Sequence, residues 1–226
     1  FIYSENTIIN QDVKSVSSDE KLDLLIAKID KLESQNKNEE VVDENDIGVI
    51  KMEVMRNEKP KNNFLKQVRK IANQNDALLI LDEIITGFRF DLGGGQKFFD
   101  VKGDFVCFGK GMGNGLPISA ITGKAEFMKT FDDLWVSSTN NAETLSMAGT
   151  IAVINEMKEK KTIPHCWSTG KKLFEEWNKI SESHNLDVKM TGYPIRMNLE
   201  CYDSNQNKSD ALKALILQEM IKKGIF

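Results

Sequence analysis

The segment ALLILDEIITGFR at residues 77–89 decides the fold. Its uninterrupted apolar run ends directly in two carboxylates, Asp82 and Glu83, and a Thr-Gly turn follows them. A short apolar run that stops at a turn is typical of a strand buried in a parallel sheet. Since ligands of open α/β sheets bind just beyond the carboxyl ends of the strands, we expect Asp82 at a functional edge.

The flanking sequence alternates strand and helix. Residues 47–54 (IGVIKMEV) favour a strand, and residues 62–73 place apolar side chains on one helical face before the central strand begins. Strand, helix and strand in this order predict a βαβ unit, and therefore an α/β fold with a mainly parallel sheet flanked by helices. Further strands are expected at 104–108, 118–122 and within 186–202, and further helices at 124–131, 143–160, 162–184 and 209–223.

Three regions differ in sequence pattern. Residues 1–46 combine polar stretches with one amphipathic helix. Its apolar stripe, formed by Leu22, Leu25, Ile29 and Leu32, favours packing on a sheet over a short coiled coil. We predict a second region at 47–185 and a third at 186–226. Because the first residue is Phe and the sequence favours a new strand where the chain stops, we expect a processed product or a fragment.

Composition narrows the classes of function. The 226 residues carry a formal net charge of −4, which gives no electrostatic basis for binding nucleic acid. Three cysteines without a Cys-x-x-Cys pair and only two histidines make us expect no metal site. No apolar run reaches the length of a membrane span and no signal peptide opens the chain, so we predict a cytoplasmic protein.

Lys110 is the second candidate for chemistry. It follows the strand expected at 104–108 and lies between Gly109 and Gly111, which let the backbone approach a ligand closely. A Walker motif is excluded because Gly111 stands where Ser or Thr is needed, and Asn114 breaks the dinucleotide pattern G-x-G-x-x-G. A lysine held at a strand end can form a Schiff base with an aldehyde, although an isolated lysine is more often a plain surface residue.

Asp82 and Lys110 together fit one cofactor. The ring nitrogen of pyridoxal needs an adjacent anion to stay protonated, and its aldehyde needs an amine. An aspartate at the end of one strand and a lysine after another can hold the two ends of a single ring, with Ile84 as an apolar contact. The alternative for Asp82 and Glu83 is a strand-end turn with two solvated acids.

At these residues the chain resembles a known family. LLILDEIITGFR at 78–89, DFVCFGKGMGNGLPISAITGK at 104–124 and SSTNNAETLSMAG at 137–149 are similar to segments of class III pyridoxal-phosphate aminotransferases, with the glutamate-1-semialdehyde aminomutase branch nearest. The resemblance implies the type I fold of pyridoxal-phosphate-dependent transferases and pyridoxal 5′-phosphate as cofactor. It also implies a cofactor-binding large-domain portion at 47–185 and a truncated C-terminal small domain of α+β type at 186–226. It also implies transfer of an amino group from a donor to a ketone or aldehyde through a lysine Schiff base. An intramolecular transfer of the aminomutase type and an inactive fragment or assembly subunit are the alternatives.

The resemblance also assigns roles to residues. Asp82 matches the partner of the pyridine nitrogen, and Ile84 matches the apolar residue packed on the ring. Lys110 matches the Schiff-base lysine that also carries the proton between the substrate carbon and the cofactor. Thr139 matches the threonine that reaches the cofactor phosphate across the interface of a homodimer. Small-molecule donors and acceptors are the implied partners.

The chain departs from the family pattern in two places. Glu53 matches an acidic strand-end position, but Val54 replaces the usual proline, so Glu53 is left out of the predicted site. The family carries an N-terminal turn that cups the phosphate and an aromatic residue that stacks on the ring, and neither is recognisable before residue 47. We therefore expect the middle portion of an aminotransferase.

Overall fold

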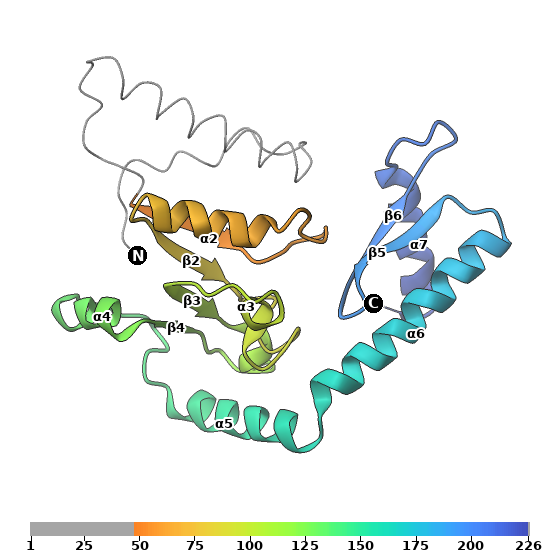
Figure 1. The fold of residues 1–226 in the computed structure, drawn as a ribbon. Helices are drawn as coiled ribbons and strands as arrows, with labels where there is room; N and C mark the ends of the chain where they lie inside the picture. Colours follow the sequence, from red (N-terminus) through yellow and green to blue (C-terminus); the bar gives the residue numbers. More distant parts are fainter. Residues whose placement is uncertain (1–47, 226) are drawn as a thin grey trace, which may run out of the picture.

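The computed structural model describes residues 48–225, and the predictions for residues 1–46 lie outside the described residues. Figure 1 shows a sheet layered with one helix, two long consecutive helices that lead away from it, and a hairpin with a final helix. The candidate residues of the sequence analysis all fall within the described part of the chain.

Four strands form the larger sheet in the order β1-β2-β3-β4. β1, β2 and β3 are parallel, whereas β4 pairs with β3 in the antiparallel sense. The register places Glu53, Asp82 and Cys107 in one row at the carboxyl ends of the three parallel strands. The predicted α/β class with a mainly parallel sheet is confirmed. The strands are β1 (Val49–Glu53), β2 (Leu78–Asp82), β3 (Phe105–Phe108) and β4 (Ala120–Gly123).

Helix α2 (Phe64–Gln74) covers one face of this sheet (Figure 1). Its buried positions Leu65, Val68 and Ala72 follow the alternating three- and four-residue spacing of a helical face. Burying each large apolar side chain stabilises the folded state by roughly 1.5–3 kcal/mol. The packing of α2 therefore holds the parallel strands in place. The strand residues that pack in the same apolar cluster include Leu79, Leu81 and Val106.

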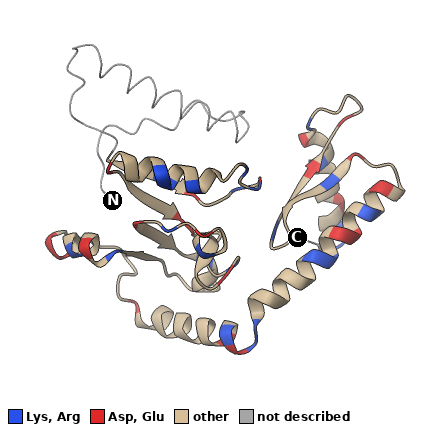
Figure 2. Cartoon of the chain, viewed as in Figure 1, with Lys and Arg blue, Asp and Glu red and all other residues tan. Residues whose placement is uncertain are grey.

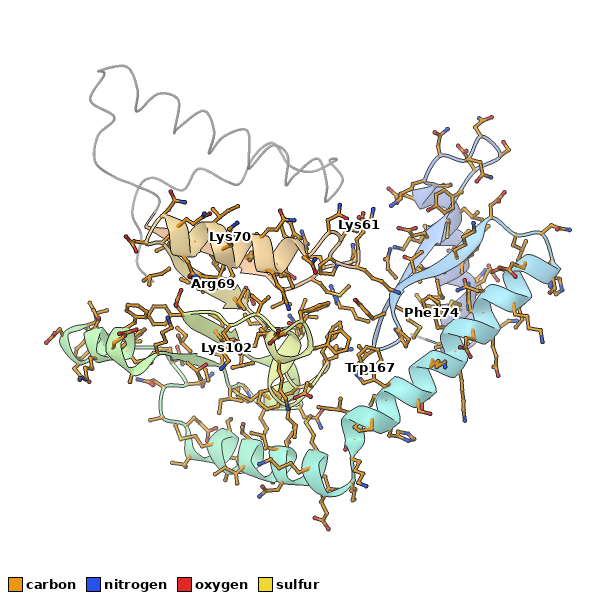
Figure 3. The ribbon with its side chains drawn as sticks, in the orientation of Figure 1. Lys61, Arg69, Lys70, Lys102, Trp167 and Phe174 are labelled. Carbon is orange, nitrogen blue, oxygen red and sulfur yellow. The ribbon has the colours of Figure 1, made fainter. Side chains whose placement is uncertain are left out.

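A buried ion cluster fastens α2 to the sheet. The Asp104 carboxylate, just before β3, accepts hydrogen bonds from Arg69 Nη1 of α2 at 2.6 Å and from the Leu79 backbone N–H at 2.8 Å. Lys124 Nζ lies 2.7 Å from its other oxygen. Burial alone would raise the pKa of Asp104, but these donors outweigh it and hold the pKa below its ordinary value. Figure 3 labels Arg69 between the helix and the sheet.

The glycine-rich segment 87–103, where the sequence predicts neither helix nor strand, contains a short helix, α3 (Gly94–Phe98). Glycine disfavours helix on local grounds, so this helix depends on a distant partner. The partner is Glu83, whose carboxylate accepts hydrogen bonds from the backbone N–H groups of Gly95 and Gln96. The prediction failed because no local pattern reports such a contact.

After β4 the chain continues through α4 (Ala125–Met128), η2 (Lys129–Asp133), α5 (Thr144–Glu159) and α6 (Thr162–Ser183). β5 (Val188–Tyr193) and β6 (Arg196–Cys201) form an antiparallel hairpin, and α7 (Asp210–Lys222) packs on β6. α6 passes so close to the hairpin turn that a side chain at Gly170 would meet the Pro194 carbonyl. These elements occupy the segments predicted from the sequence, with small shifts at their ends.

Helix α5 presents an uncharged surface over most of its length (Figure 2). We call the exposed side chains of Leu145, Met147 and Ile151 the α5 apolar surface. On its other side, the buried hydroxyls of Ser146 and Thr150 have no hydrogen-bond partner among residues 48–225. None of the helices in that range is both long enough and apolar enough to cross a membrane.

Five aromatic rings join the C-terminal hairpin to the segment after β2. Trp167 of α6 stacks on Phe98 with ring centroids 5.4 Å apart, and its indole N–H donates to the Phe90 carbonyl at 3.0 Å. Figure 3 labels Trp167 on the part of α6 that faces this segment. We call this set the aromatic cluster. Its members are Phe90, Phe98, Phe99, Trp167 and Tyr193.

Candidate active site

Asp82 is the last residue of β2, at the carboxyl edge of the sheet. Its side chain is 20% exposed, and Lys51 Nζ of β1 lies 3.6 Å from one of its oxygens. The other oxygen accepts a hydrogen bond from the Ile84 backbone N–H at 3.1 Å. The carboxylate is therefore held in place by the turn that follows it, and one side remains open to a further cationic partner.

Lys110 follows β3 and begins the short 3₁₀ helix η1 (Lys110–Met112). Its backbone has φ of 41°, a left-handed conformation that is uncommon for a residue with a side chain. Its carbonyl accepts hydrogen bonds from the N–H groups of Gly113 and Asn114, at 3.1 and 2.9 Å, which hold this conformation. The side chain is exposed and its amine has no hydrogen bond or ion pair within residues 48–225.

Ile84 brings the two strand ends together. A Cβ placed on Gly109 would lie 3.5 Å from Ile84 Cγ2, so the Ile84 side chain rests against the backbone next to Lys110. A Cβ placed on Gly111 would similarly lie 3.6 Å from the Gly87 carbonyl oxygen. The turn after β2 and the helix η1 therefore pack on each other, and three of the predicted site residues share one corner of the sheet.

Cys107 occupies the register position beside Asp82 on β3. Burial raises the pKa of its thiol, and the negative charge of Asp82 raises it further, against a smaller opposite effect of Lys51. The thiol therefore stays neutral beside the carboxylate at neutral pH. It adds no charge that would compete with a cation bound at Asp82.

Glu83 lies in a different environment from Asp82 although the two are adjacent. Its side chain is fully buried, and it accepts hydrogen bonds from Thr86 Oγ1 at 2.7 Å and from two backbone N–H groups of α3. The alternative of two solvated acids is therefore wrong for Glu83. Gly94, with φ of 80°, leaves room for this carboxylate, because a Cβ there would lie 2.6 Å from its oxygens.

The structure does not connect Thr139 to this corner. Thr139 lies in an exposed turn between η2 and α5, where it makes no hydrogen bond with any residue of the described chain. Trp135, in the same connection, has 94% of its surface exposed. The predicted role of Thr139 depends on a second subunit, and the geometry of one chain does not address it.

Sequence reasoning did not identify Lys51 as a neighbour of Asp82. The two side chains share a face because Glu53 is the register partner of Asp82, and Lys51 lies two residues earlier on β1. Period-two alternation along the strand provides that signal once the register is known. Glu53 itself forms an ion pair with Arg56 at 3.2 Å.

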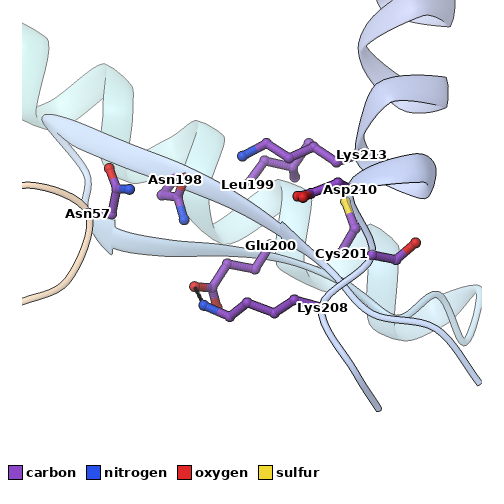
Figure 4. Close-up of a pocket in the computed structure, with 9 residues that line it drawn as sticks. Asn57, Asn198, Leu199, Glu200, Cys201, Lys208, Asp210 and Lys213 are labelled. Carbon is purple, nitrogen blue, oxygen red and sulfur yellow. Dashed lines mark hydrogen bonds and ion pairs between the residues drawn. The ribbon is translucent and has the colours of Figure 1, made fainter. Parts of the chain in front are cut away.

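A separate cavity of about 180 Å³ lies between β6 and α7 (Figure 4), and neither Asp82, Ile84 nor Lys110 lines it. An ion pair between Lys208 and Glu200, at 3.0 Å, crosses part of it. In residues 48–225 no group of three or more His, Cys, Asp or Glu side chains is arranged to hold a metal ion. The cavity is lined by Asn57, Asn198, Leu199, Glu200, Cys201, Lys208, Ser209, Asp210 and Lys213.

Comparison with known proteins gives concordant matches. The family model described as aminotransferase class-III matches residues 23–226. A glutamate-1-semialdehyde 2,1-aminomutase of Acetivibrio thermocellus is 32% identical over 74% of this chain, and the match covers 40% of that protein. A 3-aminobutyryl-CoA aminotransferase of Cloacimonas acidaminovorans is 38% identical over 60% of this chain, and the match covers 33% of that protein. The chain thus spans about two fifths of the length of the curated relatives it matches.

Solved structures share the fold. A taurine:2-oxoglutarate aminotransferase from Bifidobacterium kashiwanohense, in complex with PLP and glutamate, superposes with a TM-score of 0.74. The match covers 94% of this chain and 50% of that one, at 18% sequence identity. At this identity the likeness concerns the arrangement of helices and strands alone.

Proposed function

The chain belongs to the class-III aminotransferase family and has its type I fold, and from this premise we propose that it carries part of an amino-transfer site. The reaction moves an amino group from a small-molecule donor to a ketone or aldehyde acceptor. Pyridoxal phosphate is the cofactor of the family. The contact that carries the proposal is the packing of Ile84 against Gly109, which places Asp82 and Lys110 at one corner.

The residues at this corner fit the cofactor. Bound pyridoxal phosphate supplies a ring that withdraws electrons from the substrate carbon. The Asp82 carboxylate, fixed by the Ile84 N–H, would keep the ring nitrogen protonated. Ile84 would offer an apolar surface that excludes water from the ring face. The exposed amine of Lys110 would hold the cofactor through its aldehyde and carry a proton to or from the reacting carbon.

Intermolecular transfer and an intramolecular shift remain separate candidates. The 38% identical relative named as an aminotransferase favours the first, and the 32% identical relative named as an aminomutase favours the second. The two are distinguished by their products, since an aminomutase needs no external acceptor. Incubation with ¹⁵N-labelled donors and unlabelled acceptors separates them, because only intermolecular transfer places the label on the acceptor.

We extend the proposal to the assembly. The domain division at 47–185 and 186–226, the cytoplasmic homodimer and the phosphate contact of Thr139 belong to it as predictions. An inactive fragment or assembly subunit is the alternative, and the α5 apolar surface supports a partner in either case, since exposed apolar patches mark association sites.

The first experiment is a visible absorbance titration with pyridoxal phosphate. A Schiff base with Lys110 predicts a band above 400 nm in the unchanged chain and none in Lys110→Ala, because alanine has no amine. Lys70→Ala is the matched control, since Lys70 is an exposed lysine of α2 (Figure 3). A chain that is folded by circular dichroism yet shows no band would contradict the proposal for this chain alone. A band that survives in Lys110→Ala would exclude Lys110.

A further inference from the structure

Three arginines from three different segments meet where the C-terminal hairpin contacts the strand-end loops. Arg196, the first residue of β6, donates from Nε to the Arg56 carbonyl at 2.6 Å. Arg89, in the turn after β2, donates from Nη1 to the Ile195 carbonyl at 3.4 Å. The Arg196 guanidinium thus binds the backbone of Arg56, and the Arg89 guanidinium binds the backbone of Ile195, next to Arg196.

Positive charge is in excess at this junction. The Glu53 carboxylate acts on Arg196, and it is already paired with Arg56 at 3.2 Å. Three guanidinium groups and one carboxylate leave a net charge of 3 − 1 = +2. Burial lowers the pKa of Arg196, the negative charge of Glu53 opposes this, and the positive charges of Arg89 and Arg56 lower the pKa further. Arginine nevertheless stays charged at neutral pH, so the repulsion persists.

Arg56 and Arg196 leave most of their hydrogen-bonding capacity unused, whereas Arg89 also donates from Nε to the Ile85 carbonyl at 3.2 Å. Arg196 engages only Nε, and its two terminal nitrogens have no hydrogen-bond partner within residues 48–225. In the described part of the chain, Arg56 likewise uses only Nε, toward Glu53. A guanidinium presents its N–H groups as a planar fork that matches the two oxygens of a carboxylate or phosphate.

We propose that Arg56, Arg89 and Arg196 form a binding site for a small dianion, either a dicarboxylate or a phosphate. A dianion matches the net charge and supplies acceptors for the unused N–H groups. The site lies where Glu53 ends β1 and the turn after β2 passes, next to the sheet edge at which ligands of such folds bind. It uses neither Asp82 nor Lys110, so it does not depend on the proposed function.

The test is isothermal titration calorimetry on the full chain without pyridoxal phosphate. The probes are sodium succinate and sodium phosphate, with sodium acetate and sodium chloride at matched ionic strength as controls. We expect at least one dianion to bind more tightly than acetate by about tenfold, because the second charge is recognised too. The stronger of the two dianions identifies the source of the anion.

Variants locate the binding. Arg196→Gln removes the central fork and is expected to weaken dianion binding by about tenfold or more, in line with the loss of a charged hydrogen-bond pair. Lys70→Gln removes one positive charge from the exposed face of α2 and should change the affinity for the dianion by less than about twofold. Arg56→Gln, which keeps the backbone carbonyl that Arg196 binds, serves if Arg196→Gln does not fold, and we expect several-fold weaker binding.

Three outcomes would overturn the proposal. One is the absence of dianion binding beyond the chloride control in folded protein. Another is binding that survives both arginine substitutions, which would place the anion elsewhere, for example at a cofactor phosphate site. The third is a loss of dianion affinity in Lys70→Gln as large as in Arg196→Gln, which would mean that the net charge of the chain explains the binding. Lys110→Ala should leave dianion binding unchanged, so failure of the amino-transfer proposal is measured separately.

Discussion

At the scale of residues, two adjacent carboxylates at the end of β2 have different environments. Asp82 is partly open and accepts one backbone N–H, whereas Glu83 is fully buried and accepts three hydrogen bonds. The other Asp82 oxygen is paired, among residues 48–225, with the exposed Lys51 at 3.6 Å. Glu83 joins the turn after β2 to α3, so the two acids of this dipeptide differ in structural role.

Substitution separates these roles. Glu83→Gln places an amide N–H₂ against backbone N–H donors and is expected to lower the free energy of unfolding by about 2–4 kcal/mol. Asp82→Asn is the matched control: it retains an oxygen for the Ile84 N–H and loses only an exposed ion pair, so we expect a change within about 1 kcal/mol. Urea denaturation measures both. Equal losses in the two variants would contradict this division.

At the scale of elements, the Asp104 cluster joins α2, β2 and the segment before α4. Its carboxylate has a pKa below the ordinary value, so the folded state favours the ionised form. Such a group contributes stability above its unfolded pKa, near 3.9, and the contribution is lost as the pH falls through the folded pKa. The attachment of the helix to the sheet therefore weakens in acid.

Asp104→Asn tests this attachment. At pH 7 we expect a loss of about 3–5 kcal/mol in the free energy of unfolding, because Arg69 and Lys124 lose their buried counter-charge. Between pH 5 and pH 3 the variant should lose less stability than the unchanged chain, since the titrating group is gone. Urea unfolding across this range gives both values. Asp100→Asn, at an exposed carboxylate, is the control, and parallel pH curves for Asp104→Asn would contradict the linkage.

Elements that form on local grounds could be predicted from the sequence, and elements that need distant partners could not. The apolar run before Asp82 and the periodic face of α2 indicated the βαβ unit because their own burial patterns specify strand and helix. Helix α3 escaped prediction because its glycines are held by Glu83. The proximity of Ile84 to Gly109 followed from strand order, whereas the meeting of Arg89 with Ile195 required the three-dimensional path of α6.

At the scale of the whole molecule, the aromatic cluster connects the sheet and the C-terminal hairpin. Trp167 of α6 contacts rings that follow β2, and Tyr193 at the end of β5 contacts the same rings. Lys59 Nζ, after β1, lies 4.9 Å from the centre of the Tyr193 ring. Side chains from four segments thus share one contact, so the two parts are expected to unfold together.

Trp167→Ala removes the ring that spans this contact. We expect a loss of about 2–4 kcal/mol and earlier amide exchange in β5 and β6 than in β2, because the hairpin loses its support. Trp167→Phe keeps a stacked ring and loses only the hydrogen bond to Phe90, so it should cost about 1 kcal/mol. Hydrogen exchange by mass spectrometry follows each strand. Equal amide exchange in β2, β5 and β6 of Trp167→Ala would contradict the expectation that loss of the ring frees the hairpin from the sheet.

The α5 apolar surface has a consequence for how the protein responds to temperature. Association driven by apolar burial weakens on cooling, unlike association driven by ion pairs or hydrogen bonds. Contacts made through Leu145, Met147 and Ile151 should therefore dissociate in the cold and re-form on warming. Sedimentation velocity at 4 °C and 25 °C would show this as a reversible shift toward smaller species at the lower temperature, and Ile151→Lys would abolish the shift.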